Sequence, residues 1–447
     1  MACSVRALRS SVLLAVLLAV PGVARAQDAA VSEADASALL APVAVPAPTA
    51  QVLPAPERAV TQPASAGTPW SATAPRTLSL VGAPGRGVTL QTDDDFFALT
   101  LRGRIQVRDS VVAPSIGAVT NEINVRTLRV LFSGHVLSRN VQFNVQLAFG
   151  PQDYEANMVS PLFDAWASFT HLRDLSVRVG QFFVPFDRAR TNAEWGLNMI
   201  DRPLVIAEAT LDRDVGVELS SNDLGGLGLL AYRLGVFGGE GKNRLASSPG
   251  FLYVARLQAN PFGAFDDSVE GDQHRVRRPR LAVGVAGAFN HQSQRQRSTQ
   301  GSTYQLGTFD YAHAAADVTF KYAGLYLFGE ALYRQGLADS RTGMTAAMPS
   351  AMLTEYSRST AGYVFQAGMM LVSRLELVAR WEQSFALGMT DPTLVAQLRT
   401  QGSQLGAGLN WYQDGHGFKV QADYHYIFGD VVAQGRHQAR VQVQLSF

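Results

Sequence analysis

Apolar and polar residues alternate along most of the chain after residue 95. In FFALTLRGRIQVRD (96–109), Phe97, Leu99 and Leu101 share one face, and Thr100, Arg102 and Arg104 share the other. A period of two is typical of a β-strand with one apolar and one polar side. The same pattern recurs in NVQFNVQLAF (140–149), SRLELVARWE (373–382), GFKVQADYHYIF (417–428) and the C-terminal ARVQVQLSF (439–447).

The alternation predicts about sixteen antiparallel strands. They start near residues 96, 124, 140, 161, 174, 213, 227, 250, 280, 309, 325, 359, 374, 401, 417 and 436. Most strands are about ten residues long, which suits a tilted membrane-crossing strand, and charged residues sit in mid-strand as a water-filled interior permits. The sequence therefore predicts an all-β fold, a transmembrane β-barrel of about sixteen strands whose last strand pairs with the first, because closure leaves no unpaired edge.

The connectors between the predicted strands alternate in length. Long loops follow the odd-numbered strands, at 150–160, 183–212, 238–249, 291–308, 336–358, 387–400 and 429–435. Short turns follow the even-numbered strands, as at one rim of outer-membrane barrels. The connector 261–279 is an exception, because it falls on the short side yet is long; either a strand is missed there or the turn carries an insertion.

The first 90 residues differ from the rest. Residues 1–26 combine Arg6 and Arg9, an apolar run and an Ala-Arg-Ala end, which predicts a cleaved signal peptide that contains the only cysteine, Cys3. Residues 27–90 are rich in Ala and Pro and predict a disordered periplasmic linker. The barrel is then expected over 91–447, in the bacterial outer membrane and in contact with its lipid.

Composition agrees with this assignment. Hydrophobic residues make up 47% and charged residues 17% of the chain, whereas soluble domains carry roughly 25% charged residues. Three of the 38 Lys and Arg lie in the predicted signal peptide, which leaves 35 against 37 Asp and Glu. This balance argues against a nucleic-acid partner and against a strongly anion-attracting field.

Several segments resemble the phosphate-selective porin O and P family of outer-membrane porins. VRVGQFFVPFDRAR (177–190) is similar to the family's segment leading into its third loop, and LDRDVGVELSS (211–221) to the strand that returns from it. LGVFGGEGKN (234–243), ARLQANPF (255–262) and 406–428 resemble later strands. The resemblance covers about 95–447 and implies a usually trimeric, sixteen-stranded porin whose third loop folds inward to narrow the pore.

Two groups of residues are candidates for a role in transport. If the polar face of the first strand is luminal, Arg102, Arg104 and Arg108 form a cationic ladder; the alternative is that such arginines sit at the rims or pair with carboxylates. Further pore-lining candidates are Arg178, Arg233, Arg256 and Arg380. The candidates in the constriction loop are Asp187, Arg188, Arg190, Glu194, Asp201, Arg202 and Glu208, unless that loop stands outside the barrel.

The sequence favours a passive channel for small hydrophilic solutes. Selectivity for anions such as phosphate stays open, because phosphate needs clustered cationic donors and the chain has only three lysines, Lys242, Lys321 and Lys419. The alternatives are a barrel that acts as an adhesin or receptor and a barrel hydrolase. No enzymatic activity, cofactor or metal is expected, since GVFGGEGKN lacks the P-loop spacing and the histidines show no ligand spacing.

Overall fold

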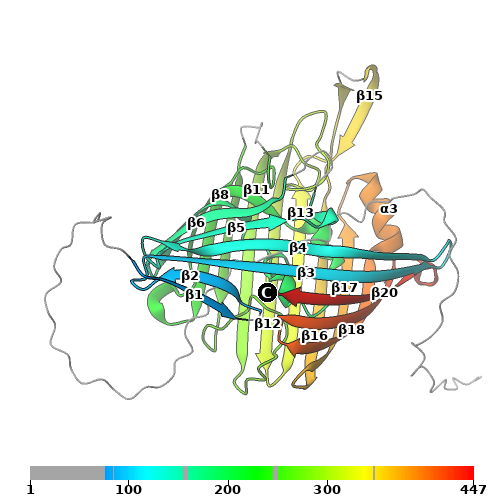
Figure 1. Ribbon diagram of the computed structural model, residues 1–447. Helices are drawn as coiled ribbons and strands as arrows, with labels where there is room; N and C mark the ends of the chain where they lie inside the picture. Colours follow the sequence, from blue (N-terminus) through cyan, green and yellow to red (C-terminus); the bar gives the residue numbers. More distant parts are fainter. Residues whose placement is uncertain (1–75, 84, 155–159, 245–249, 346–347) are drawn as a thin grey trace, which may run out of the picture. The chain divides into compact units, whose positions relative to one another are not determined.

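The computed structural model describes residues 76–447 except 84, 155–159, 245–249 and 346–347. Within this part of the chain, 18 strands form one sheet, and all of them except β1 and β2 close into a ring of sixteen antiparallel strands (Figure 1). The ring consists of β3 (Phe97–Pro114), β4 (Thr120–Val136), β5 (Val141–Ala148), β6 (Leu162–Leu172), β7 (Leu175–Phe183), β8 (Arg213–Ser221), β9 (Leu230–Phe237), β10 (Leu252–Ala259), β11 (Arg280–Ser293), β12 (Phe309–Tyr322), β13 (Leu325–Gly336), β16 (Thr360–Val372), β17 (Leu375–Ala386), β18 (Ser403–Asp414), β19 (Phe418–Phe428) and β20 (Arg436–Ser446). The predicted barrel and its strand number are confirmed.

The barrel closes between its last strand, β20, and its first, β3. Their antiparallel register runs from Arg436 opposite Pro114 to Ser446 opposite Arg104. One residue further on, Phe447 exchanges two backbone hydrogen bonds with Gly103, of 2.6 and 2.9 Å. A Cβ at position 103 would lie 2.4 Å from the Phe447 ring, so the glycine makes room for the terminal aromatic side chain.

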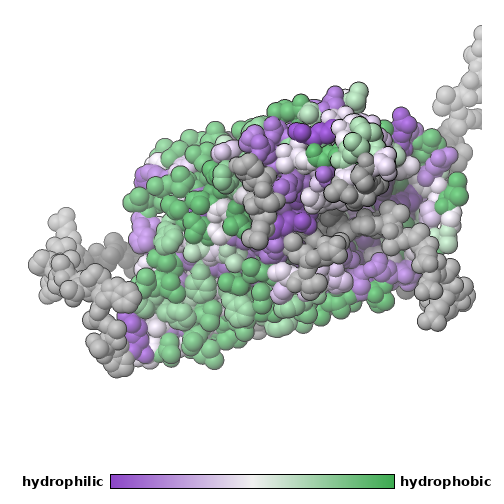
Figure 2. Space-filling view, turned by 90° about the horizontal axis from the view of Figure 1, so that it is seen from above, coloured by the Kyte–Doolittle hydropathy of each residue, from purple (hydrophilic) through white to green (hydrophobic). Residues whose placement is uncertain are grey.

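The two faces of the wall follow the alternation in the sequence. On β20, Val441 and Val443 are 49% and 40% exposed on the outside, whereas Gln442 and Gln444 are buried on the inside. Figure 2 shows hydrophobic residues over the flank of the barrel and hydrophilic residues toward the middle of the face seen from above. This arrangement presents an apolar surface to lipid and keeps the charged side chains within the ring.

A short hairpin precedes the barrel, formed by β1 (Leu78–Ala83) and β2 (Gly87–Thr92). β2 pairs with the part of β3 that β20 does not reach, from Val88 opposite Leu101 to Gln91 opposite Ala98. The predicted linker 27–90 is therefore wrong at its C-terminal end, since β2 pairs with the edge of β3 that β20 leaves unpaired. The predicted signal peptide, 1–26, and residues 27–75 lie outside the described residues.

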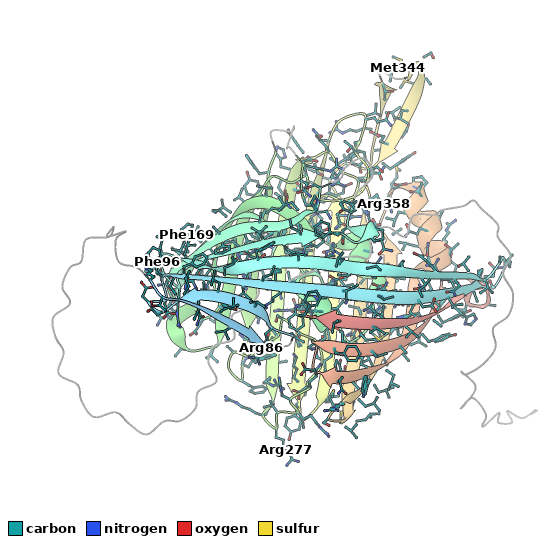
Figure 3. The ribbon with its side chains drawn as sticks, in the orientation of Figure 1. Arg86, Phe96, Phe169, Arg277, Met344 and Arg358 are labelled. Carbon is teal, nitrogen blue, oxygen red and sulfur yellow. The ribbon has the colours of Figure 1, made fainter. Side chains whose placement is uncertain are left out.

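The loops at one rim carry extra structure that the alternation does not predict. β14 (Ser340–Thr345) and β15 (Met348–Tyr356) form a two-stranded hairpin that stands away from the ring, with Met344 near its tip (Figures 1 and 3). Helix α3 (Pro392–Gln401) begins after Asp391, whose carboxylate accepts a hydrogen bond from the Thr393 N–H. In the described part of the chain no helix is long and apolar enough to cross a membrane.

The loop between β7 and β8, residues 184–212, is called L3 here. It contains α1 (Arg188–Thr191), a 3-10 turn η2 (Glu194–Gly196) and α2 (Leu204–Ala209). Phe186, Ile206 and Leu211 are fully buried and pack with Phe328 and Leu332 of β13 in one apolar cluster. L3 therefore folds inward, as the family resemblance implies.

The long connector between β10 and β11 contains no additional barrel strand. Its described residues 260–279 carry no regular element, so the question that the sequence left open at 261–279 is resolved as an insertion in a turn.

Candidate constriction site

L3 is fastened to opposite sides of the lumen by different kinds of contact. Its apolar residues face β10, β13 and β16, where Val205 and Ile206 belong to the same buried cluster as Val254 and Val364. Two of its acidic residues, Glu194 and Asp201, face the arginine-rich wall built by β3, β4 and β20. The loop thus spans the interior and leaves less room for solutes at its level.

Asp201 is the main ionic anchor of L3. Arg108 of β3 donates two hydrogen bonds to its carboxylate, of 2.8 and 2.9 Å, and Arg440 of β20 donates one of 2.6 Å. Arg126 of β4 lies 3.6 Å away. Burial by itself would raise the pKa of Asp201, but these three guanidinium groups lower it well below its usual value. The carboxylate therefore stays charged and holds three strands at one point.

Glu194, which precedes Asp201 in L3, forms a second ionic anchor of the loop. It accepts a 2.9 Å hydrogen bond from Thr127 and lies 3.6 Å from Arg129 of β4, which also pairs with Asp153 in the preceding loop. Burial favours the neutral acid, but Arg129 and Arg104 outweigh it and lower the pKa of Glu194 to about 2. This anchor is charged at neutral pH.

Glu208, near the C-terminal end of L3, attaches the loop to β13 and to the long loops at the rim. Its carboxylate lies 2.5 Å from Arg334 of β13 and accepts two 3.0 Å hydrogen bonds from Arg358. Arg358 also donates to Asp391, the residue that caps α3. This network connects L3 to the loops that follow β13 and β17, so their positions depend on one another.

The remaining predicted charges of L3 mostly hold the loop itself together. The Asp187 carboxylate caps α1 by accepting from the Arg190 N–H at 2.7 Å, and Arg190 pairs with Asp212 at 2.6 Å. Arg202 donates to the Asn192 carbonyl at 2.6 Å. Arg188 instead pairs with a residue outside L3, Asp267 of the β10–β11 connector, at 3.0 Å. Since L3 lies inside the ring, the alternative that it stands outside the barrel is wrong.

The three arginines of the predicted ladder point inward but differ in their partners. Arg102 donates to the Arg86 carbonyl in the β1–β2 turn at 3.0 Å, and Arg108 pairs with Asp201. Arg104 lies between them and is buried, and its Nε and Nη1 atoms have no hydrogen-bond partner among the described residues. Arg104 thus keeps buried donor atoms without a partner among the described residues, whereas Arg102 is more exposed.

The other predicted pore-lining arginines all carry acidic partners. Arg178 and Arg233 flank Glu218 at 3.8 and 3.1 Å, and their side chains keep 14% and 29% exposure. Arg256 pairs with Asp317 at 2.6 Å, and Arg380 lies 3.3 Å from Glu382; both are buried. The alternative of arginines paired to carboxylates therefore describes these four, of which Arg178 and Arg233 are the more exposed.

The sequence did not single out several residues of this site. Arg126 and Arg129 lie next to an irregularity in the β3–β4 register, which breaks the alternation that marks inward positions. The Trp166 ring lies 4.7 Å from the Arg178 guanidinium on the inner side of the wall. Its inward direction follows from its position along β6, which alternates in step with the buried Asp164 and Ser168.

The charged groups of the lumen do not resemble a metal centre. Among the described residues, no group of three or more His, Asp or Glu side chains is placed to hold a metal ion. The acidic side chains pair with arginines instead, as the contacts of Asp201 and Glu208 illustrate.

Comparison with known proteins locates the fold rather than a family. No protein-family model matches the chain, and no curated protein sequence matches it. The structure is similar to that of Salmonella typhi OmpF in complex with daunomycin, with 14% identity and a TM-score of 0.51 over 79% of this chain and 99% of that chain. Two further similar structures are an anion-selective porin from Comamonas acidovorans (11% identity, TM-score 0.49, 78% and 99% coverage) and the outer membrane channel DcaP of Acinetobacter baumannii (11%, 0.49, 80% and 99%). The likeness to OmpF shows that this chain has the fold of a sixteen-stranded porin barrel.

Proposed function

We propose that the protein is an outer-membrane channel through which small hydrophilic solutes diffuse passively. The observation that carries the proposal is the arrangement of L3, a charged loop held across the inside of a barrel whose outer face is apolar. Sixteen strands enclose more space than their own side chains fill. A solute then passes through a narrowed, charged region without any chemical step.

The exposed arginines suggest where the passage runs. Arg178 and Arg233 keep 14% and 29% exposure, whereas Arg108 and Arg129 keep 7% and 1% under L3. We infer that solutes move along β7 to β9, past Glu218, which is shared by Arg178 and Arg233. The local electrostatic field along this path has contributions from both positive and negative side chains.

The finer proposal is a preference for anions, with phosphate as one candidate. It is supported by Arg104, whose buried guanidinium retains donors for an anion, and by the arginines gathered on β3, β4 and β20. The resemblance to phosphate-selective porins is consistent with this. Asp201 and Glu194 neutralise much of that wall, so we propose a moderate preference rather than strict selection. Assembly as a homotrimer is likewise proposed from the resemblance, and chemical cross-linking of the purified protein tests it.

Reconstitution into planar bilayers tests the proposal. The purified protein is expected to produce discrete conductance steps, and the absence of steps overturns the channel. Reversal potentials across a KCl gradient, with added phosphate, then report selectivity. Arg104→Ala should reduce the anion permeability ratio, whereas Arg139→Ala, an exposed rim arginine paired with Asp95, should leave it unchanged.

A further inference from the structure

The turn between β10 and β11, residues 260–279, enters the lumen from the rim opposite the long loops. Its middle section bonds to L3 through the backbone: the Ala193 N–H donates to the Ser268 carbonyl at 2.8 Å, and the Glu270 N–H donates to the Gly196 carbonyl at 3.0 Å. Two backbone bonds between a turn and a loop from opposite rims mean that the two segments meet inside the barrel.

Side chains anchor this turn on several sides. The Glu270 carboxylate accepts hydrogen bonds from the Asn198 N–H at 3.0 Å and from Gln366 of β16 at 2.8 Å. Lys321 of β12 donates to the Val269 carbonyl at 2.6 Å. Asp267 pairs with Arg188 of L3 at 3.0 Å. The turn is therefore attached both to the wall and to L3.

The contact between the turn and L3 is close. A Cβ built at Gly196 would lie 2.9 Å from a Val269 methyl group and 3.2 Å from the Val269 Cβ. A larger side chain at position 196, opposite an intact Val269, would push the turn away from the loop. The absence of a side chain there lets the two backbones approach, which is a recurrent use of glycine.

The turn separates its charges by sign. Asp266, Asp267, Glu270 and Asp272 belong to the half that lies in or near the lumen, and Glu270 and Asp272 are buried. Arg275, Arg277 and Arg278 belong to the exposed half, and Figure 3 shows Arg277 at the end of the barrel opposite Met344. Asp266 is the exposed carboxylate of the four, whereas Asp267 pairs with Arg188 and Asp272 with Arg280.

We propose that residues 264–272 form a second constriction element. It contacts L3 from the periplasmic side and narrows the periplasmic half of the pore with acidic groups. This inference rests on the proposed channel function. It distinguishes this turn from the other connectors at the same rim, such as Ala323–Gly324, which only join neighbouring strands. The acidic groups oppose the arginine wall, so the turn lowers the anion preference that the wall creates.

A disulfide tests whether the turn is seated against L3. Gly196→Cys together with Val269→Cys would place two Cβ atoms 3.2 Å apart, slightly closer than the about 3.5–4.5 Å of bridged cysteines, and Val269→Cys removes the methyl group that lies 2.9 Å from the new Cβ. The only native cysteine, Cys3, lies in the predicted signal peptide. Mild oxidation of the membrane-embedded double variant should link the peptides that contain 196 and 269, as detected by mass spectrometry. Failure to link them, in a variant that migrates as a folded barrel, overturns the proposed seating.

Thiol labelling tests whether the turn narrows the pore. Asp266 is exposed, and the Lys321 ammonium lies 3.4 Å from its carbonyl inside the ring. A charged methanethiosulfonate attached to Asp266→Cys should reduce single-channel conductance by about half, because added bulk in a constriction blocks ions. The same reagent on Arg277→Cys, at the outer end of the turn, should have no such effect.

The two proposals fail in different ways. A wild-type protein without conductance overturns the channel function itself. If the wild-type protein conducts but labelling of Asp266→Cys and Arg277→Cys changes the conductance equally little, only the second constriction is overturned.

Discussion

Replacement of Asp201 by Asn tests how L3 is held, because it removes one charge without changing the shape of the side chain. Asp201 accepts hydrogen bonds from Arg108 and Arg440 at 2.6 to 2.9 Å, and Arg126 lies 3.6 Å away. Its side chain is 15% exposed and the arginines are 6–7% exposed. The substitution would leave three buried guanidinium groups without their shared carboxylate.

The expected cost follows from this burial. Loss of one partner of a buried ion pair destabilises a protein by about 3–5 kcal/mol, mostly because the remaining charge lacks compensation. The barrel wall does not depend on this contact for its backbone hydrogen bonds, so the cost should fall on the docking of L3. Since about 1.4 kcal/mol corresponds to a factor of ten, transient opening of L3 should become about 140- to 3,700-fold more frequent.

Hydrogen exchange followed by mass spectrometry measures this opening directly. Peptides covering 197–203 should exchange faster in Asp201→Asn by that factor, while peptides from β18 and β19 should be unchanged. In bilayers the variant should show noisier current and a higher anion permeability ratio. Asp430→Asn is the matched control, because Asp430 is exposed and lies 4.0 Å from Arg399. Equal exchange in the variant and the wild type would refute the reasoning that Asp201 anchors L3.

Further predictions concern the other contacts of the site and the seam. Glu208→Gln should loosen the loops around Arg358, because Glu208 binds Arg358 with both carboxylate oxygens; limited proteolysis of the folded barrel should detect faster cleavage there. The pKa of Glu194 is lowered from 4.5 to about 2, so its contribution to L3 docking is fully present above pH 4.5 and is lost as pH falls toward 2. Hydrogen exchange of residues 193–197, corrected for the intrinsic exchange rate, should stay constant from pH 7 to 5. Protection that stays constant down to pH 2 would contradict the role of Glu194 as an anchor. Gly103→Val should impair closure, because any Cβ there meets the Phe447 ring. Heat-modified mobility on gels should show less folded barrel, whereas the same change at Gly287, an exposed position of β11 where a Cβ meets nothing nearer than 3.9 Å, should leave assembly unchanged.

The barrel could be predicted because the strand pattern is local. In β20 each residue's side is fixed by its position along the chain, and the buried Gln442 and exposed Val441 follow directly from the period of two. The β1–β2 hairpin escaped prediction for the opposite reason. Leu78 and Leu80 alternate for only six residues beside a Pro-rich stretch; they pair with β2, which in turn pairs with the free edge of β3.

The site was predictable only in part. Alternation indicates that Arg108 points inward, but its partner Asp201 lies 93 residues away and Arg440 binds the same carboxylate from 239 residues away. No local pattern encodes such pairing. Asp201 itself was identified because L3 interrupts the strands with clustered charges, whereas the inward path of 260–279 had only its unusual length as a signal.

The shared carboxylate of Asp201 links the docking of L3 to the order of folding. One of its arginines belongs to the first barrel strand and another to the last, so the complete binding site for the loop does not exist until β3 and β20 have met. A chain halted before its final strand would lack half of the Asp201 anchor, although the contacts of Glu194, Glu208 and the apolar residues of L3 do not involve that strand. Protection of the residues around Asp201 from exchange should therefore reach its full level only after the seam has formed, later than protection of the rest of L3.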